Sequence, residues 1–369
     1  MNFTETLNNK EAKRKLASIQ KVINITPIPG SDFIELAQIQ GWSSIIKKGE
    51  FSIGDLAVYF EIDSFLPERK EFEFLRKSSW KQNSQNGSGF RIKTMKMRNT
   101  LSQGLLLKPE LFAELPQNLN VGDDVTDLLK IKKYYTPEVS AGTLGMSDGP
   151  FPTHLTEKTD ELRLQSNPEF IDKMKNIPYY VAVKYDGTSI TIIKNNNEIS
   201  VNSRNLSLKK ENSVIWDLLE EKSVLDKLES YPDNIVIKGE LYGEGIQSNP
   251  LKIKGKNIAI FTIEKDGLQV GLNELLTISN YFGLDTVDVE EVGGATDFEK
   301  DLITNYFPNI KFTELFSETI DSLLNKAKGF YPSGNVREGI VIRPLFSQDL
   351  SKDVISFKVI NNDFLLKEK

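Results

Sequence analysis

A segment rich in proline, glycine, serine and threonine divides this sequence into two parts of different texture. The segment is TPEVSAGTLGMSDGPFPT, residues 136–153. Such clusters interrupt helices and strands and are typical of linkers. Short apolar runs separated by turns precede it, and longer strand patterns mixed with helical ones follow it. We therefore predict two domains, residues 1–135 and 154–369, joined by a linker at 136–153, which suits a chain of 369 residues.

The composition excludes several classes of protein. The chain has no cysteine, so disulfides, thiolate metal sites and cysteine nucleophiles are excluded. It has one histidine, His154, so a metal site of several histidines is excluded as well. No run of about 18 apolar residues occurs, and the first residues lack the apolar core of a signal peptide. We expect an intracellular, cytoplasmic and monomeric protein with no membrane partner.

The first part of the sequence predicts a small β-barrel. Its apolar runs are rich in Ile, Val, Phe and Tyr, and turn sequences such as PIPGSD and GEFSIGD separate them. Several short strands with weak helical signal favour an OB-like barrel. The predicted strands cover residues 16–25, 33–39, 42–47, 56–62 and 104–108, and residues 121–125 predict a turn into a strand or short helix.

A basic stretch in this first part points to nucleic acid. No acidic residue occurs between Glu73 and Glu110, whereas Trp80 and Phe90 lie among the basic ones. Cations contact phosphates and aromatic rings stack on bases, so this mixture suits a nucleic-acid surface. The alternative is a solvated basic loop with its tip at residues 83–89. The candidate contacts are Lys77, Lys81, Arg91, Lys93, Lys96 and Arg98.

The second part predicts an α+β fold. Strand patterns occur at residues 179–185, 188–194, 198–204, 234–243, 258–264, 339–344 and 354–360. Helical patterns occur at residues 212–231, 273–283 and 318–330, with Asn212 or Ser213 as the N-cap of the first. These elements do not alternate as in βαβ units, so a doubly wound parallel sheet is not expected.

Lys184 is the first candidate for a reactive residue. It ends an apolar strand and opens the sequence K-Y-D-G, residues 184–187. Partial desolvation lowers the pKa of an amine from about 10.4, and a neutral amine is a nucleophile. Asp186 points to the same side of an extended chain and can orient the lysine or hold a cation. The alternative is a strand-end turn with a solvated lysine.

Five further elements follow Lys184 in a fixed order. Arg204 follows a strand, Glu240 precedes a tyrosine-glycine strand end, Phe261 lies in an apolar strand, Glu338 precedes a glycine, and Lys358 lies in the last strand. Taken one at a time, these residues could have purely structural roles. Phe261 could belong to the core, the two glutamates could be surface charges, and the stem of Lys358 could lie along the core with its amine in water. In this order with K-x-D-G, they resemble the lysine-dependent nucleotidyltransferases: RNA ligases, DNA ligases and mRNA capping enzymes.

A segment upstream of Lys184 narrows the resemblance. FPTHLTEKTDELRLQ, residues 151–165, is similar to a segment of ATP-dependent RNA ligases. From about residue 13 to 366 the chain resembles the Deinococcus- and Naegleria-type RNA ligases. That family implies an N-terminal OB-like β-barrel module, followed by an ATP-grasp-like nucleotidyltransferase domain of antiparallel sheets with flanking helices.

The resemblance implies a reaction sequence. In this family the lysine that Lys184 matches attacks the α-phosphate of ATP and forms a lysyl-AMP. The AMP passes to the 5′-phosphate of RNA, and a 3′-OH then displaces it. The implied cofactors are ATP and Mg²⁺ or Mn²⁺, and the implied partner is RNA or an RNA/DNA nicked duplex. The resemblance also implies that the basic stretch of the first part binds RNA.

The resemblance also implies roles for individual residues. Asp186 and Glu338 match residues that hold the water of the metal ion, and Ser356 stands where some relatives have a second lysine. That phosphate contact is therefore either missing or supplied by another residue, with Lys352 as a candidate. The implied nucleotide-binding residues are Lys184, Arg204, Glu240 at the ribose, Phe261 at adenine, Glu338, Lys358 at the α-phosphate, backbone groups near Val183, and Arg163 with Gln165.

Two alternatives remain beside an RNA ligase. One is a DNA ligase or a GTP-using capping enzyme, which usually carries its OB module after the catalytic domain. About ten residues follow Lys358, so we expect no such module there. The other is an OB-type nucleic-acid binding protein with an inactive transferase domain, against which the intact Lys184 and Glu338 count.

Overall fold

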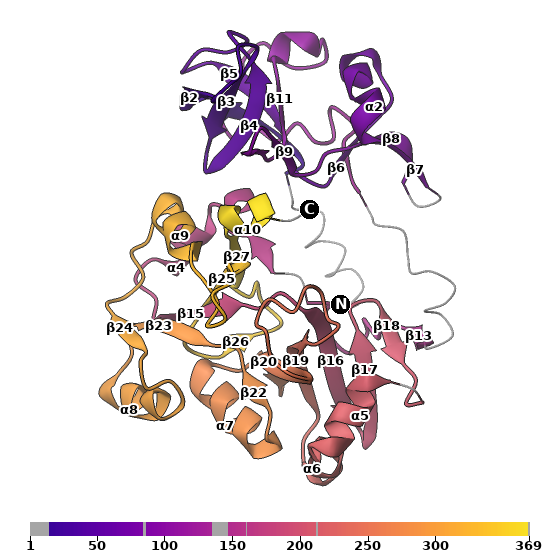
Figure 1. Ribbon diagram of the computed structural model, residues 1–369, viewed down its shortest axis with the longest axis vertical. Coiled ribbons are helices and arrows are strands. Elements are labelled where there is room, and N and C mark those ends of the chain that lie inside the picture. Colours follow the sequence, from indigo (N-terminus) through magenta and orange to yellow (C-terminus); the bar gives the residue numbers. More distant parts are fainter. Residues whose placement is uncertain (1–14, 84–85, 135–146, 160, 212, 368–369) are drawn as a thin grey trace. The chain divides into compact units, whose positions relative to one another are not determined.

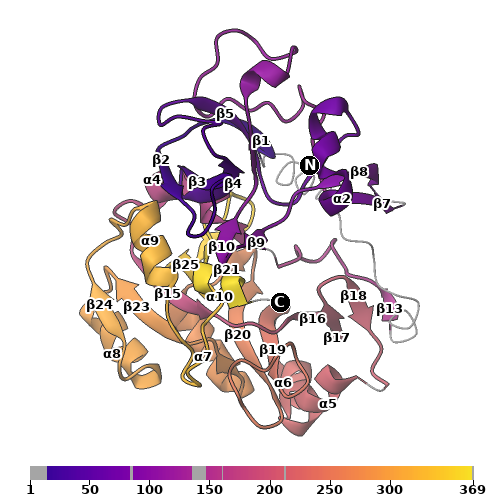
Figure 2. The same cartoon turned by 45° about the horizontal axis from the view of Figure 1, so that its top comes forward.

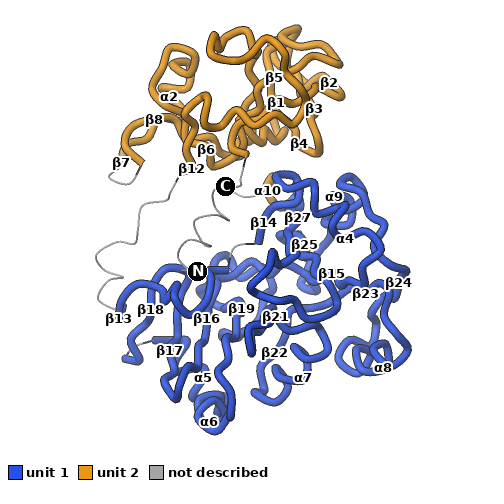
Figure 3. The backbone as a smooth tube through the Cα atoms, turned by 180° about the vertical axis from the view of Figure 1, so that it is seen from behind, with its two compact units in different colours: residues 1–4, 140–364 blue, residues 5–139, 365–369 orange. Residues whose placement is uncertain are grey.

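The computed structural model describes residues 15–83, 86–134, 147–159, 161–211 and 213–367 of the chain. The chain forms two compact units (Figure 3). The smaller unit comprises residues 5–139 and 365–369, and the larger unit residues 1–4 and 140–364. The predicted linker does not coincide with this division, because Ser147–Pro150 form strand β13, which pairs with β18 (Leu206–Leu208) of the larger unit.

The centre of the smaller unit is an antiparallel sheet of β1 (Ala17–Lys21), β5 (Leu56–Phe60) and β11 (Leu105–Leu107). Successive side chains of a strand point to opposite faces. Ala57 and Tyr59 therefore join one buried cluster, and Val58 and Phe60 join another. Both faces of β5 are covered, which explains its uninterrupted apolar sequence.

Further short strands surround this central sheet (Figure 2). They form an antiparallel sheet of three strands, an antiparallel pair and a sheet of four strands. The sheet of three contains β2 (Asn24–Pro27), β3 (Ile34–Ile39) and β4 (Trp42–Lys47), and the pair is β9 (Met95–Met97) with β10 (Thr100–Ser102). The sheet of four runs in the order β12 (Lys132–Lys133), β6 (Ser64–Leu66), β8 (Gly87–Arg91) and β7 (Trp80–Asn83).

The structure corrects one alternative and one expectation for the smaller unit. The alternative of a plain loop for the basic stretch is wrong, because the stretch contains the end of the 3-10 helix η1 (Lys70–Leu75), the short helix α2 (Arg76–Ser79) and the strands β7 to β10. Residues 121–125 form neither a named strand nor a helix. They make a turn that a single bridge between Ser18 and Asp124 joins to β1.

The larger unit is built on two sheets (Figure 1). The first has nine strands, most of them antiparallel, and the second has six. The nine-stranded sheet contains, besides β13 and β18, β17 (Glu198–Ser203), β16 (Thr188–Asn195), β19 (Ile235–Gly243), β20 (Lys256–Lys265), β21 (Leu268–Gln269), β26 (Gln348–Asp349) and β22 (Asp285–Thr286). The six-stranded sheet runs in the order β14 (Leu162–Arg163), β27 (Phe357–Ile360), β25 (Gly339–Pro344), β15 (Tyr179–Lys184), β23 (Val289–Gly293) and β24 (Lys311–Thr313).

Helices cover the two sheets. Helix α9 packs against β25 and β27 of the six-stranded sheet, and α7 packs against β20 and β22 of the nine-stranded sheet (Figure 1). The helices are α4 (Phe170–Met174), α5 (Val214–Glu221), α6 (Val224–Ser230), α7 (Leu272–Phe282), α8 (Asp297–Tyr306), α9 (Ile320–Ala327) and α10 (Asn362–Lys367).

The helix predicted at residues 212–231 is two helices. Ser223 lies between α5 and α6 with φ of 55°, in the left-handed region that ends a right-handed helix. Ser213 is the N-cap residue of α5. The continuous apolar period does not reveal this break, because both helices bury the same side, with Leu219 and Leu228 in one cluster.

The strand β15 is buried on both faces. Tyr179 and Val181 join a cluster with Leu323 of α9, whereas Tyr180 and Ala182 face the core shared with the nine-stranded sheet. This two-sided packing fixes the strand that ends at Lys184. Across the described residues, no helix is long and apolar enough to cross a membrane.

Candidate active site

A cavity of about 390 Å³ in the larger unit collects residues of both sheets. The six-stranded sheet contributes β15, β25 and β27, and the nine-stranded sheet contributes β19 and β20. Among the residues that line it are eight predicted from the sequence: Val183, Lys184, Asp186, Arg204, Glu240, Phe261, Glu338 and Lys358.

Strand pairing explains how residues far apart in the sequence meet there. Lys184, the last residue of β15, pairs with Gly339 of β25, which places Glu338 beside it. Val341 of β25 in turn pairs with Lys358 of β27. Lys358 lies between two residues of the buried core, so its own side chain points to the opposite face, toward the cavity.

Two glycines of the predicted motifs have no room for a side chain. A Cβ on Gly187 would lie 2.4 Å from the carbonyl oxygen of Leu241 and 2.8 Å from Cγ of Glu240. A Cβ on Gly339, which has φ of 156°, would lie 2.2 Å from the carbonyl oxygen of Val359. The glycines therefore let neighbouring strands approach closely beside Asp186 and Glu338.

The lysine at the end of β15 is paired with a carboxylate. Nζ of Lys184 donates to Oε2 of Glu338 at 2.7 Å. Burial alone would lower the pKa of Lys184, but the charges of Glu338, Glu240 and Asp186 outweigh burial and raise it. The expectation that desolvation lowers this pKa is therefore wrong for the protein without ligands. The sequence could not show that three carboxylates surround the amine.

The same closeness of charged groups also shifts the pKa of Glu240. Burial raises the pKa of Glu240 to about 7 and outweighs the opposing attraction of Lys184, while the charges of Glu338 and Asp186 add smaller contributions in the same direction as burial. Three carboxylates, those of Asp186, Glu240 and Glu338, thus lie near the ammonium group of Lys184. Such a strongly perturbed pKa in a cleft is typical of a functional site.

The donor set fits a hard divalent cation held through water. Carboxylate oxygens are the ligands that Mg²⁺ and related ions prefer, and Mg²⁺ usually keeps several waters. In the part of the chain that the structure describes, no group of three or more His, Cys, Asp or Glu side chains is arranged to hold a metal ion directly. The excess negative charge around Lys184 nevertheless suits a cation whose own waters contact Asp186 and Glu338.

Residues that the sequence analysis missed line the cavity near Phe261. The guanidinium of Arg343 lies 5.7 Å from the centre of the Phe261 ring and donates through Nη2 to Glu161. Arg343 is only 2% exposed. Thr159 lines the same cavity. An arginine inside the apolar strand GIVIRP is a signal that could have been noticed, because a buried arginine requires a partner.

The expected role of backbone groups near Val183 stays a prediction. The Val183 amide donates to the carbonyl of Asp288 at 2.8 Å, so this N–H is engaged within the fold. Val183 itself lines the cavity.

Three other predicted residues do not line this cavity. Lys352 pairs with Asp349 at 3.5 Å and is largely exposed, so the structure does not bring it to the site. Arg163 and Gln165 lie beside the cavity strand, because Arg163 of β14 pairs in register with Lys358 of β27. Nε of Arg163 donates to Oε1 of Gln165 at 3.3 Å, and Gln165 is buried.

Comparison with known families and structures agrees with this site. A family model described as RNA ligase matches residues 177–360, and an OB-fold domain model matches residues 16–109. A mutant of the Naegleria gruberi RNA ligase, solved with ATP and manganese, has 32% sequence identity and a TM-score of 0.73, covering 96% of this chain and 99% of that chain. This chain belongs to the RNA ligase family. The family, the fold class and the enzyme class predicted from the sequence are confirmed.

Two further structures of the Naegleria ligase match this RNA ligase equally well. One is a mutant solved with AMP and manganese, at 32% identity and a TM-score of 0.73, and the other was solved with pyrophosphate, at 33% identity and a TM-score of 0.72. Each match covers 96% of this chain and 99% of the other. These ligands agree with the expected ATP and divalent cation. No curated protein matches the chain in sequence.

The candidate RNA contacts of the ligase divide into two groups within the smaller unit. Lys77, Lys81, Lys93 and Lys96 are exposed. Lys96 nevertheless donates to the carbonyl of Leu366, and the two arginines also have structural partners.

Nη2 of Arg91 donates to Asp63 at 3.0 Å, and its guanidinium lies 4.4 Å from the centre of the Tyr134 ring. Arg98 donates to the carbonyl of Gly30. Lys77, Lys81 and Lys93 are therefore the stronger candidates for phosphate contacts.

Proposed function

We propose that this ligase joins an RNA 3′-OH to a 5′-phosphate at nicks in a duplex, through a lysyl-AMP at Lys184 and an adenylylated 5′ end. The observation that carries the proposal is the position of Lys184. Its amine lies in the cavity wall, 2.7 Å from Glu338, and both Phe261 and Lys358 line the same cavity. This set offers a nucleophile, a ring for a base and a second cation in one place.

In the first step the neutral amine of Lys184 attacks the α-phosphorus of ATP. A nitrogen–phosphorus bond forms, the bond from phosphorus to the bridging oxygen breaks, and pyrophosphate leaves. The amine must lose its proton first, and the surrounding carboxylates now oppose that loss by raising its pKa. Phosphoryl transfer depends mainly on positioning and charge stabilisation, and Lys358 is the second cation at the cavity.

The other predicted residues suit the remaining parts of AMP. Phe261 offers a ring face to adenine, and Glu240 can accept hydrogen bonds from ribose hydroxyls. We place Arg204 at the ribose or the RNA terminus, because it lines the cavity and is exposed. Arg163 and Gln165, beside β27, are assigned to holding Lys358 in place and not to the nucleotide itself.

A divalent cation belongs to this proposal. Asp186 and Glu338 would hold it through its water shell, as the donor set suggests. When bound, Mg²⁺ or Mn²⁺ supplies positive charge that offsets the carboxylates and the phosphates. Asp186 and Glu338 each keep a carboxylate at the cavity, so both are expected to be required for adenylylation.

The second half of the reaction needs RNA, and we assign its binding to the smaller unit. The acid-free stretch between Glu73 and Glu110 lies in that unit and carries the exposed lysines. OB-folds bind nucleic acids on a strand face. We retain the two predicted domains, with the division between residues 139 and 140 where the two units meet in sequence, and the expectation of a monomeric cytoplasmic enzyme, as parts of this proposal.

The decisive experiment follows label from ATP into protein. The purified chain is incubated with α-labelled ATP and Mg²⁺ or Mn²⁺ and then separated under denaturing conditions. We expect a labelled chain with ATP and not with GTP. Absence of label would favour the alternative of a binding protein with an inactive transferase domain, and equal labelling with GTP would favour a capping-type enzyme.

A panel of nicked duplexes tests the substrate. RNA or DNA is placed on the 3′-OH side and on the 5′-phosphate side, and sealing is measured for the four combinations. We expect sealing to require ribose on the 3′-OH side, because the 2′-OH is the group that distinguishes RNA from DNA at a given position. Equal sealing of an all-DNA nick would contradict this and favour a DNA ligase.

The basic stretch is tested by salt dependence. Replacing Lys77, Lys81 and Lys93 by serine should lower the log–log salt slope of RNA binding by about one unit for each lost phosphate contact. The matched control replaces three exposed lysines of the same unit outside the stretch: Lys21, Lys48 and Lys132. Equal slopes for both triple variants would refute the assignment, whereas label transfer from ATP to the protein should be unchanged in both.

A further inference from the structure

Tyr331 lies behind the candidate nucleophile and has no role in the chemistry described above. It follows α9 and is 2% exposed. Its hydroxyl donates to the carbonyl oxygen of Lys184 at 2.7 Å. The hydroxyl oxygen of Tyr331 also accepts from the amide of Asp186 at 3.1 Å and from the amide of Glu338 at 3.2 Å. One side-chain oxygen thus bonds the backbone of three residues at the active site.

These three hydrogen bonds come where strand pairing stops. The ladder between β15 and β25 ends at the pair Lys184 and Gly339. Asp186, two residues past Lys184, and Glu338, directly before Gly339, belong to neither strand. The hydroxyl of Tyr331 accepts from both of their amides and so continues the connection beyond the last rung. The carbonyl of Glu338 is held in turn by the amide of Asn361 at 2.8 Å.

The position of the Tyr331 hydroxyl is itself fixed. The amide of Tyr331 donates to the carbonyl of Asn335 at 2.8 Å within a tight loop. Asn335 and Ser333 anchor that loop to the carbonyl of Pro250, at 2.7 and 2.6 Å. The ring of Tyr331 also packs edge-on against Tyr185, with 6.1 Å between ring centres. The oxygen is therefore held from the loop side as well as from the strand side.

We propose that Tyr331 is a positioning residue for adenylylation: it holds the K-x-D-G turn against the segment of Glu338, so that the Lys184 amine and the two carboxylates keep their mutual geometry. This inference rests on the proposed function. Tyr331 does not line the cavity, so it acts through the backbone of other residues. Misplacing reacting groups by about 1 Å can cost about 100-fold in rate.

The test removes one oxygen atom in Tyr331→Phe. We expect the single-turnover rate of labelling at saturating ATP to fall about 10- to 100-fold. The ATP concentration that gives half-maximal rate should change by less than about 3-fold, because the cavity wall keeps its side chains. The final fraction of labelled chains should stay close to that of the wild type, since the nucleophile remains present.

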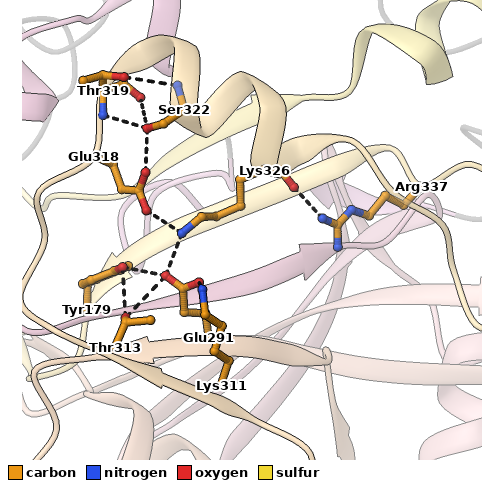
Figure 4. Close-up of polar contacts among 9 residues, drawn as sticks. All are labelled: Tyr179, Glu291, Lys311, Thr313, Glu318, Thr319, Ser322, Lys326 and Arg337. Atoms are coloured by element: carbon orange, nitrogen blue, oxygen red, sulfur yellow. Dashed lines mark hydrogen bonds and ion pairs between the residues drawn. The ribbon is translucent and has the colours of Figure 1, made fainter.

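Tyr179→Phe is the matched control. Tyr179 lies on the same strand as Lys184, is equally buried, and donates its hydroxyl to Glu291 at 2.6 Å (Figure 4). It is outside the cavity. If Tyr331 had a structural role only, both variants would lose stability in thermal unfolding and both would label at the wild-type rate. That result would overturn the proposal.

A second measurement needs no ATP. Backbone amide exchange should become faster at Asp186 and Glu338 in Tyr331→Phe and stay unchanged there in Tyr179→Phe, because only the first variant loses their acceptor. Unchanged exchange at both amides would overturn the proposed clamp. A wild-type chain that takes no label would instead refute the proposed function, and the exchange data would still show whether the clamp exists.

Discussion

The two ends of β15 hold buried charges in opposite ways. At the end of Tyr179, the carboxylate of Glu291 accepts from Tyr179 and Lys326 at 2.6 Å each and from Lys311 at 3.1 Å (Figure 4). At the end of Lys184, three carboxylates surround one lysine. We call the first the balanced end, because cations and a hydroxyl contact its buried carboxylate. We call the second the unbalanced end, because three carboxylates lie near Lys184, although Lys358, Arg204 and Arg343 line other parts of the same cavity.

The pKa values express this difference. Burial raises the pKa of Glu291, but the hydrogen bonds from Lys326, Tyr179 and Lys311 outweigh burial and hold it below its usual value. Burial raises the pKa of Glu240 to about 7, and the single lysine nearby does not reverse the shift. A buried cluster whose charged groups all have partners stabilises the fold. A cluster with more carboxylates than nearby cations is suited to bind a ligand that brings positive charge.

The largest expected effect comes from breaking the unbalanced end. Lys184→Ala should abolish labelling by ATP, because the nucleophile is gone, and the chain should still fold cooperatively. We expect a loss of at least about 1,000-fold, which is the order seen when a covalent nucleophile is removed. Denaturing electrophoresis after incubation with α-labelled ATP measures it. Label retained in Lys184→Ala would show that a different residue carries the AMP.

The next effect concerns Arg343, which lies between the two ends and pairs across the sheet with Tyr180 of β15. Its ion pair with Glu161 is buried, with side-chain exposures of 2% and 16%. Arg343→Met leaves the carboxylate of Glu161 without its charged partner, which should cost about 3–5 kcal/mol of unfolding free energy. Chemical denaturation measures this loss.

A double variant shows whether the loss comes from the unpaired charge. Adding Glu161→Gln to Arg343→Met should restore a large part of the stability, because the uncompensated carboxylate is removed. If the double variant is as unstable as the sum of the single ones, the two side chains do not interact, and packing of Arg343 against Phe261 explains its effect.

Much of this arrangement could be predicted from the sequence, because it depends on local patterns. The continuous apolar run of β15 and the K-x-D-G motif locate Lys184 at a strand end. The resemblance carried by the order of the later motifs points to Glu240, Phe261, Glu338 and Lys358. The glycines of two motifs are explained by close strand contacts.

The charge balance could not be predicted in the same way. The pKa of Lys184 depends on carboxylates from β19 and from the segment before β25, which only strand pairing brings near. The pair of Arg343 and Glu161 joins two distant segments. Glu161 lies in the segment 151–165 that carries the resemblance, but nothing in the sequence indicates that Arg343 is its partner. The break at Ser223 depends on one backbone angle within a continuous apolar pattern.

A smaller effect is expected at the balanced end. Lys326 lies on α9, whose last turn Arg337 caps through the carbonyls of Lys326 and Ala327. Lys326→Met removes the closest cation from Glu291 and should cost about 2–3 kcal/mol, less than for a wholly buried pair, because Lys311 remains. Labelling by ATP should persist in the folded variant. Loss of labelling without unfolding would mean that the two ends are coupled through β15.

The smallest effect is a change in acid sensitivity. The pKa of Glu291 lies below its usual value in the folded protein, so the unfolded chain binds more protons below about pH 4.5. The stability that Glu291 contributes is therefore present at neutral pH and is lost as the pH falls toward its folded pKa. Glu291→Gln binds no such proton. It should be less stable than the wild type by about 1–2 kcal/mol at pH 7 and nearly equal to it at acidic pH.

Denaturation at pH 7, 5 and 3.5 measures whether the two stability curves converge. Glu220→Gln, which removes an exposed carboxylate on α5, is the matched control and should stay parallel to the wild type. The comparison isolates Glu291, because every other carboxylate is common to the variant and the wild type. Parallel curves for Glu291→Gln would mean that Lys326, Lys311 and Tyr179 do not favour the ionised carboxylate. The balanced end would then owe its stability to packing, and the contrast with the Lys184 end would not be electrostatic.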